Sequence, residues 1–288
     1  MSVKPKLKKQ FFTVLKILIS IILIGIVFRK LNWEEIKSML KTANWFYVIL
    51  AVLFFLFSQV ISIFRFNLFI RKAGVRLSFE ANSKLYLLGM FYNFFLPGGV
   101  GGDAYKAYAI SKAHSKSLKS IGQVVFVDRF SGILAIGFII SILVLFLKTP
   151  FPYFLNLLVF GLGILTTFFV LRYVIRLMHT HKKRIYLGFL YSLGIQVAQA
   201  ICILLILKSF QIEGNYLVYI MMFLISSVLS VISFAGLGIR EAVFYYGAHW
   251  FNFNPDVSAS VALSFSLITA AVSFLGIIYL FQKIPLKK

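Results

Sequence analysis

The stretch NFFLPGGVGGD, residues 93–103, interrupts two segments that are apolar enough to lie in a bilayer. Non-helical backbone is tolerated at membrane depth only where protein buries it or where it lines a wet cavity, because its N–H and C=O groups need partners. Pro97 ends the helix before the break, and Asp103 is placed to cap a new helix over residues 104–113. The break is therefore a candidate binding site, since the free N–H groups of a helix start face it.

A second stretch, GLGIREA at residues 236–242, repeats part of this pattern. Once one residue is inserted, both stretches read glycine, apolar residue, glycine, and then an acidic residue followed by alanine. We expect a second break over residues 233–238 and a return helix over residues 240–250. Glycine pairs also recur by chance in membrane helices, so this similarity alone leaves both a repeat and a coincidence open.

The composition indicates a polytopic membrane protein. Hydrophobic residues make up 60% of the chain, charged residues only 13%, and the mean hydropathy is +0.93, whereas soluble domains carry about a quarter charged residues. The net charge of +22 does not indicate nucleic-acid binding, because the basic residues form short clusters between apolar runs, as the positive-inside rule describes. The lone Cys202 and the loop residues His179 and His181 predict no disulfide framework, metal site or cofactor.

We expect an all-α polytopic membrane protein with about six full spans and two glycine-broken hairpins, about eight membrane segments in all. The basic tail before the first span puts the N-terminus in the cytoplasm, and that span has no small-residue cleavage site, which predicts that it is retained. An amphipathic helix over residues 32–41 suits the outer interface. The predicted spans cover residues 11–28, 45–70, 121–147, 154–175, 185–207 and 257–281.

The two predicted hairpins enter the membrane from opposite sides. The arms of the first, residues 85–96 and 104–113, are each too short to cross a bilayer, and basic clusters flank the hairpin at both ends. The second has arms over residues 216–232 and 240–250. Together with their flanking spans, the hairpins form two units of opposite orientation, which is typical of alternating-access transporters. Because the arm over residues 216–232 is long enough to span, eight plain spans joined by glycine-rich loops remain the alternative.

Several charges lie in or beside apolar segments, where each unpaired charge costs about 2.5 to 3.5 kcal/mol on insertion scales. Asp128 and Arg129 are neighbours on a helix and cannot face each other, so we expect each to find a partner among the hairpin charges. Arg65 joins them if it does not extend to the interface instead. The alternative is that these charges are structural ion pairs and helix caps. A cavity lined by these charges would be neutral to slightly positive, which suits an anionic phosphate headgroup. The candidate headgroup-binding residues are Asn93, Gly101, Gly102, Asp103, Lys106, Asp128, Arg129, Gly236, Gly238, Arg240 and Glu241.

At these motifs the sequence resembles the transmembrane region of the lysylphosphatidylglycerol synthases, a family of flippase-like membrane proteins. Two departures stand out. Lys106 stands where the family often has arginine, which keeps the charge and loses bidentate phosphate contact, and Ser233-Phe234-Ala235 replaces a proline-containing approach to the second turn. The matching motifs are Asn93 with Leu96-Pro97-Gly98, Gly101-Gly102-Asp103, Asp128-Arg129 with Gly132, and Gly236-Leu237-Gly238 with Arg240-Glu241.

The resemblance implies a translocase that moves an anionic, aminoacylated or glycosylated lipid across the cytoplasmic membrane. We expect one transmembrane domain over residues 1–288 without a soluble synthase domain, and therefore no catalytic residues. The expected partners are membrane lipids with anionic headgroups, together with a possible lipid or glycolipid synthase. Two alternatives stay open: a phosphatidylglycerol lysyltransferase-type protein, and an accessory subunit of envelope glycolipid synthesis.

Overall fold

The computed structural model describes residues 34, 41–95, 100–147, 152–230 and 238–286. Residues 43–288 form one compact unit, and residues 1–42 form another. The span predicted over residues 11–28 lies outside the described residues. So does the interfacial helix predicted over residues 32–41, apart from Glu34 and Lys41.

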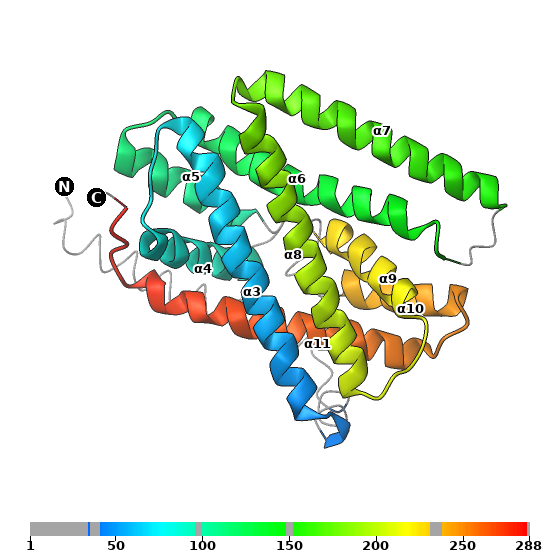
Figure 1. Ribbon diagram of the computed structural model, residues 1–288. Coiled ribbons are helices and arrows are strands. Elements are labelled where there is room, and N and C mark those ends of the chain that lie inside the picture. Colours follow the sequence, from blue (N-terminus) through cyan, green and yellow to red (C-terminus); the bar gives the residue numbers. More distant parts are fainter. Residues whose placement is uncertain (1–33, 35–40, 96–99, 148–151, 231–237, 287–288) are drawn as a thin grey trace, which may run out of the picture. The chain divides into compact units, whose positions relative to one another are not determined.

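All regular secondary structure in the described ranges is helical, and the predicted all-α class is confirmed. The α-helices are connected by short loops and by the segments that fall between the described ranges (Figure 1). They are α3 (Trp45–Ile70), α4 (Phe79–Phe95), α5 (Gly101–His114), α6 (Leu118–Leu143), α7 (Tyr153–Met178), α8 (Lys182–Ser209), α9 (Tyr216–Leu229), α10 (Ile239–Trp250) and α11 (Pro255–Phe274), with the 3-10 helices η1 (Arg71–Ala73) and η3 (Leu275–Leu280).

In the described part of the chain, five helices are long and apolar enough to cross a membrane, namely α3, α6, α7, α8 and α11. They coincide with the five predicted spans that fall in the described residues, with ends that differ by a few positions. α3 begins at the predicted Trp45 because the side chain of Asn44 accepts the N–H of Phe46 at 3.1 Å. α6 begins earlier than predicted because Ser117 caps it, its Oγ accepting the N–H of Ser120 at 3.1 Å.

The first predicted hairpin corresponds to α4 and α5, which pack against each other. The prediction that Asp103 caps the second arm is wrong, because α5 already begins at Gly101. Asn93 provides the acceptor instead, since its Oδ1 accepts the N–H of Gly102 at 2.8 Å across the break. The two arms approach so closely that a Cβ on Gly102 would collide with the carbonyl group of Gly89. Position 102 therefore requires glycine, because any other residue would place its Cβ against this carbonyl group.

The second predicted hairpin corresponds to α9 and α10, which also pack against each other. α9 has 14 residues, fewer than the predicted arm over residues 216–232 and fewer than the roughly 17 that a spanning helix needs. Residues 231–237, between α9 and α10, lie outside the described residues. Gly238 precedes α10 with a φ of 87°, a backbone conformation that favours glycine.

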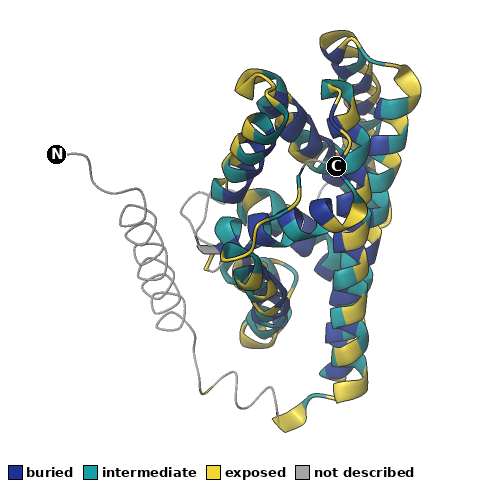
Figure 2. Cartoon of the chain, turned by 90° about the vertical axis from the view of Figure 1, so that its left-hand side faces the viewer, coloured by how far each residue is buried: buried dark blue, intermediate teal, exposed yellow. Residues whose placement is uncertain are grey.

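The spans and hairpins are arranged in two similar halves. α3 and α8 lie side by side and run in opposite directions. α6 and α11, which are further apart, also run in opposite directions (Figure 1). α6 and α11 each contact both α3 and α8, while α4 contacts α11 and α9 contacts α6. One hydrophobic core joins the first half of α3 to the end of α8 and to α9, α10 and α11; the other joins the second half of α3 to α4, α5, α6 and α7. Buried residues line the inward sides of the helices, and exposed ones the outward sides (Figure 2).

Candidate functional site

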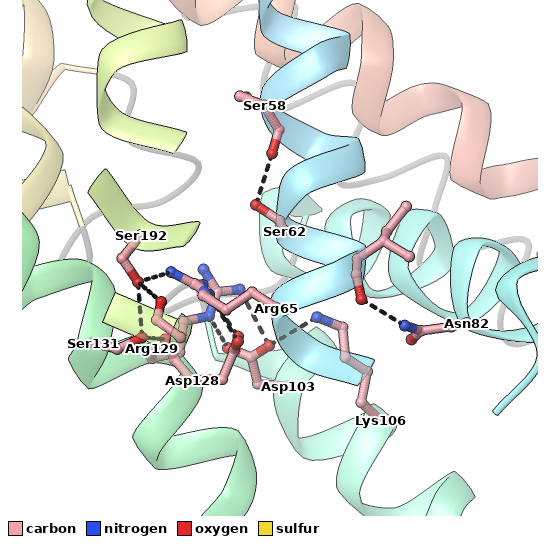
Figure 3. Close-up of polar contacts among 12 residues, drawn as sticks. Ser58, Ser62, Arg65, Asn82, Asp103, Lys106, Asp128, Arg129, Ser131 and Ser192 are labelled. Carbon is pink, nitrogen blue, oxygen red and sulfur yellow. Dashed lines mark hydrogen bonds and ion pairs between the residues drawn. The ribbon is translucent and has the colours of Figure 1, made fainter. Parts of the chain in front are cut away.

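The first charged group ties the return arm of the first hairpin to the next span. Both carboxylate oxygens of Asp103 on α5 accept hydrogen bonds from Arg129 on α6, from Nε at 2.6 Å and from Nη2 at 3.1 Å (Figure 3). Lys106, one turn further along α5, donates from Nζ to Oδ1 of Asp103 at 3.2 Å. Asp103 is thus buried between two cations, which explains why its carboxylate is not used as a helix cap.

Lys106 is almost completely buried, with 2% of its surface exposed. Its ammonium lies 4.2 Å from the ring centroid of Tyr86 and 5.6 Å from that of Phe66. Its stem passes Gly89, where any Cβ would collide with the lysine side chain. The absence of a side chain at Gly89 therefore gives Lys106 the room to reach Asp103.

Arg129 differs from its partners in exposure. The Asp103 side chain is 6% exposed, whereas the Arg129 side chain is 49% exposed. The guanidinium holds Asp103 through Nε and Nη2, which leaves its Nη1 outside this ion pair.

The second charged group links three long spans. Arg65 on α3 donates to both carboxylate oxygens of Asp128 on α6, at 2.9 and 3.2 Å, and through Nη1 to Ser192 on α8 at 2.9 Å (Figure 3). The Oγ of Ser192 lies 3.0 Å from that of Ser131 on α6. Arg65 and Asp128 are both buried, so a bidentate pair of this kind holds the three helices in register.

The sequence prediction for Asp128 and Arg129 was partly wrong. The two adjacent residues do have different partners, as expected from their positions on one helix. Asp128, however, pairs with Arg65 on a span rather than with a hairpin charge. Arg65 was missing from the predicted site residues, although an arginine that falls within an apolar helix is itself a signal of a buried partner.

The third group lies at the start of α10. Arg240 is 6% exposed, donates from Nη1 to Ser266 of α11 at 3.2 Å, and lies over Phe265 with 4.8 Å between the guanidinium carbon and the ring centroid. Its Nε has no hydrogen-bond partner. Among the described residues, no carboxylate oxygen lies within 4.0 Å of Arg240.

Glu241 stabilises the beginning of α10. Its Oε2 accepts the N–H of Gly238 at 2.5 Å, and its Oε1 accepts the hydroxyl of Ser266 at 2.9 Å. Ser266 thus stands between the carboxylate of Glu241 and the guanidinium of Arg240. No feature of the sequence singled out Ser266, since a serine in an apolar helix is common.

The predicted site residues therefore fall into separate groups. Asn93, Gly102, Asp103, Lys106 and Arg129 lie together around the first hairpin, with Gly101 at the first position of α5. Asp128 belongs to the neighbouring group with Arg65. Gly238, Arg240 and Glu241 lie at the second hairpin. Gly236 lies outside the described residues.

The comparison with known proteins agrees with this architecture. UPF0104 membrane protein PH1989 of Pyrococcus horikoshii is 29% identical over 147 residues, which cover 49% of this chain and 42% of that relative. The match thus spans less than half the length of the relative. A family described as the lysylphosphatidylglycerol synthase TM region matches residues 13–183 and 175–280, nearly the whole chain. With its apolar spans, this multi-pass membrane protein belongs to the lysylphosphatidylglycerol synthase TM region family.

Proposed function

We propose that this protein is a lipid translocase that moves an anionic, aminoacylated or glycosylated lipid across the cytoplasmic membrane. The observation that carries the proposal is Arg240, a buried arginine with an unpartnered Nε and no carboxylate of the described residues in ion-pair distance. The cations of the other half, Arg65, Lys106 and Arg129, each contact a carboxylate. Among the buried cations of the described residues, Arg240 is the one without a carboxylate contact.

The surroundings of Arg240 suit a phosphodiester. Arginine stays charged in proteins, and a buried charge without a partner costs several kcal/mol. The first turn of α10 adds backbone N–H groups without intrahelical partners and the positive end of the helix dipole. Arg240 is connected to this helix start through Ser266 and Glu241, the latter bound to the N–H of Gly238. A phosphate oxygen near Nε would supply the missing acceptor.

An inverted repeat provides the framework for translocation. Asp103 contacts Arg129, which lies 26 positions further along the chain, and Arg240 contacts Ser266, also 26 positions further along. Each contact joins the return arm of a hairpin to the following span. The opposite directions of α3 and α8, and of α6 and α11, relate the two halves as an inverted pair (Figure 1). Inverted repeats built around interrupted helices support alternating access.

The orientation in the membrane follows from the basic clusters. One hydrophobic cluster gathers residues from the same end of several helices: Val75, Ile110, Met178 and Ile185, with Ile284 packed against them. They lie after η1, near the end of α5, at the end of α7, at the start of α8 and after η3, and each has a basic residue within two positions in the sequence. The positive-inside rule assigns this end to the cytoplasm, and the same rule assigns the N-terminus to that side.

The test compares the parent protein with Arg240→Gln, which keeps hydrogen-bonding capacity and removes the charge. Both are reconstituted into phosphatidylcholine vesicles that contain an acyl-labelled phosphatidylglycerol, and transbilayer movement is measured. Loss of a charged hydrogen bond predicts a reduction of roughly tenfold or more. The matched control is Arg172→Gln, at an exposed position of α7, with movement unchanged.

The melting temperature of Arg240→Gln decides between binding and structure. Because the charge has no ion-pair partner among the described residues, its removal leaves the melting temperature within a few degrees of the parent. Unchanged lipid movement by the folded variant refutes the role of Arg240 in binding. A collapse of the melting temperature assigns Arg240 a structural role instead.

A further inference from the structure

A buried, uncharged polar cluster lies in the middle of the two central helices. It consists of Ser58 and Gln59 on α3 and Gln196 and Gln199 on α8, the helices that lie side by side. Ser58, Gln59 and Gln196 are at most 7% exposed. Ser58 and Gln59 lie near the midpoint of α3, and Gln196 lies near the midpoint of α8, so the cluster is far from both ends of the spans.

The hydrogen bonds of this cluster are incomplete. Ser58 Oγ accepts from Gln59 Nε2 at 3.0 Å and from Gln199 Nε2 at 3.3 Å, which accounts for one glutamine of each helix. Gln196 Oε1 is buried and has no partner among the described residues. An unsatisfied buried acceptor costs about 1 to 3 kcal/mol, so this oxygen calls for a donor.

The cluster lies between the cationic groups of the two halves. On α8, Gln196 is one turn from Ser192, which binds Arg65, and about 9 Å along the helix axis from Cys202 at 1.5 Å per residue. Cys202 lies near enough to Arg240 for an electrostatic interaction. On α3, Ser58, Ser62 and Arg65 follow one another along one side (Figure 3). Gln196 therefore lies on α8 between Ser192, which contacts the first cationic group, and Cys202, which is near the second.

The repeat relates the glutamines of α3 to those of α8. The shift along the chain that brings Arg129 onto Ser266 also brings Gln59 onto Gln196, and Ser62 onto Gln199. The two glutamines thus occupy equivalent places in α3 and α8, which pack against each other. In transporters built from inverted repeats, substrate sites lie at the repeat interface near the midplane.

The charged residues around the cluster indicate which kind of hydrogen-bond donor suits Gln196 Oε1. Asp103 of the first hairpin and Asp128 of α6 form ion pairs with cations. Glu241 accepts hydrogen bonds from Gly238 and Ser266. An ammonium group at Gln196 could not use Asp103 or Asp128, whose charges are already compensated by cations, and it would lie on α8 between the contacts of Arg65 and Arg240. A neutral hydroxyl donates the hydrogen bond without that repulsion.

We infer that Gln196, with Gln59 and Gln199, forms a midplane site for the hydroxyl groups of an anionic lipid headgroup, such as a glycerol or a sugar. This inference rests on the proposed function and narrows its substrate from aminoacylated or glycosylated lipids to hydroxylated ones. Gln196 provides the acceptor, and Arg240 binds the phosphate of the same headgroup.

The experiment compares three acyl-labelled lipids in phosphatidylcholine vesicles: phosphatidylglycerol, phosphatidylpropanol and phosphatidylethanolamine. Phosphatidylpropanol keeps the charge of the phosphodiester and lacks the hydroxyls. The parent protein moves phosphatidylglycerol faster than either of the others. Gln196→Leu, of similar size, lowers the rate for phosphatidylglycerol roughly two- to tenfold, the value of one net hydrogen bond, and leaves phosphatidylpropanol unchanged. Gln123→Leu, at an exposed position of α6, changes neither rate.

The outcomes separate the two proposals. If the parent moves none of the lipids, the proposed function fails, and this inference fails with it. If the parent moves phosphatidylglycerol and phosphatidylpropanol equally, or if folded Gln196→Leu keeps the preference, the translocase stands and the hydroxyl site is refuted. A preference for phosphatidylethanolamine over phosphatidylpropanol that Gln196→Leu abolishes assigns the site to amines and also overturns the inference. Gln196→Leu melts no lower than the parent, because no hydrogen bond to Oε1 is lost; a lower melting temperature with an unchanged preference makes Gln196 a packing residue.

Discussion

Arg129 on α6 holds both carboxylate oxygens of Asp103 on α5, and this contact fastens the return arm of the first hairpin to the neighbouring span. The corresponding contact in the second half, between Arg240 and Ser266, has no negative charge. The two halves therefore differ in the property that matters for an anionic ligand. At the first hairpin a cation pairs with a carboxylate, and at the second the cation contacts a neutral hydroxyl.

The pairing of Arg129 with Asp103 predicts a specific pattern of coupled mutations. Arg129→Ala lowers the free energy of unfolding by about 3 kcal/mol, the lower end of the range for a broken buried pair, because part of the arginine is exposed. Asp103→Ala is at least as damaging, because it strands both Arg129 and Lys106. The double variant recovers part of the sum, as thermal denaturation of the purified protein would detect. Arg129→Ala combined with Glu241→Ala is the control and shows additive losses; coupling there instead would contradict the pairing.

The buried pair of Arg65 and Asp128 predicts that one partner cannot be removed alone. Asp128→Asn leaves the Arg65 charge uncompensated and lowers the free energy of unfolding by about 3 to 5 kcal/mol. Replacing both, as Arg65→Met with Asp128→Leu, restores most of the loss, since apolar residues of similar volume replace a buried pair at little cost. Thermal melts of the single and double variants measure this. A double variant no more stable than Asp128→Asn would mean that the pair is needed for more than charge balance.

The close approach of the hairpin arms predicts a strict requirement for glycine at one position. Gly102→Ala places a Cβ against the backbone of Gly89, which cannot move aside without separating α4 from α5. We expect a loss of about 1 to 3 kcal/mol, typical of overpacking. Gly122→Ala in α6 is the matched control, because no atom lies within 4 Å of the added Cβ, and alanine favours the helix by about 0.5 to 1 kcal/mol. Equal melting temperatures for the two variants would refute the close contact.

The hairpin topology predicts the sidedness of two engineered cysteines. Ser83 lies in the first turns of α4, and Ser115 follows α5. Cysteines introduced singly at these positions react with a membrane-impermeant maleimide only from the cytoplasmic side. The natural Cys202 is buried and gives the unlabelled background. Labelling of either cysteine from outside would replace the hairpin by plain spans.

The sequence predicted the elements better than their contacts. The spans at α3, α6, α7, α8 and α11 follow from hydropathy, which depends only on neighbouring residues. The two helix pairs α4–α5 and α9–α10 follow from glycine breaks and flanking charge, but α4 has 17 residues and is longer than the arm predicted over residues 85–96. Their end points moved where a cap was not anticipated, as at Ser117 and at Asn93, whose side chain caps a helix across the break.

Which charges pair was decided by the tertiary structure. Arg65 and Asp128 are 63 positions apart, and no local pattern distinguishes Arg65 from an arginine that extends to the interface. Likewise, hydropathy marks Arg240 as unusual in an apolar segment, but only the packing of α10 on α11 leaves its Nε without a partner. Hydropathy is a local property of the chain, whereas compensation of a buried charge depends on what lies within a few ångströms in space. The sequence by itself therefore determined where charges enter the membrane, and the fold determined which buried cation has no carboxylate partner among the described residues.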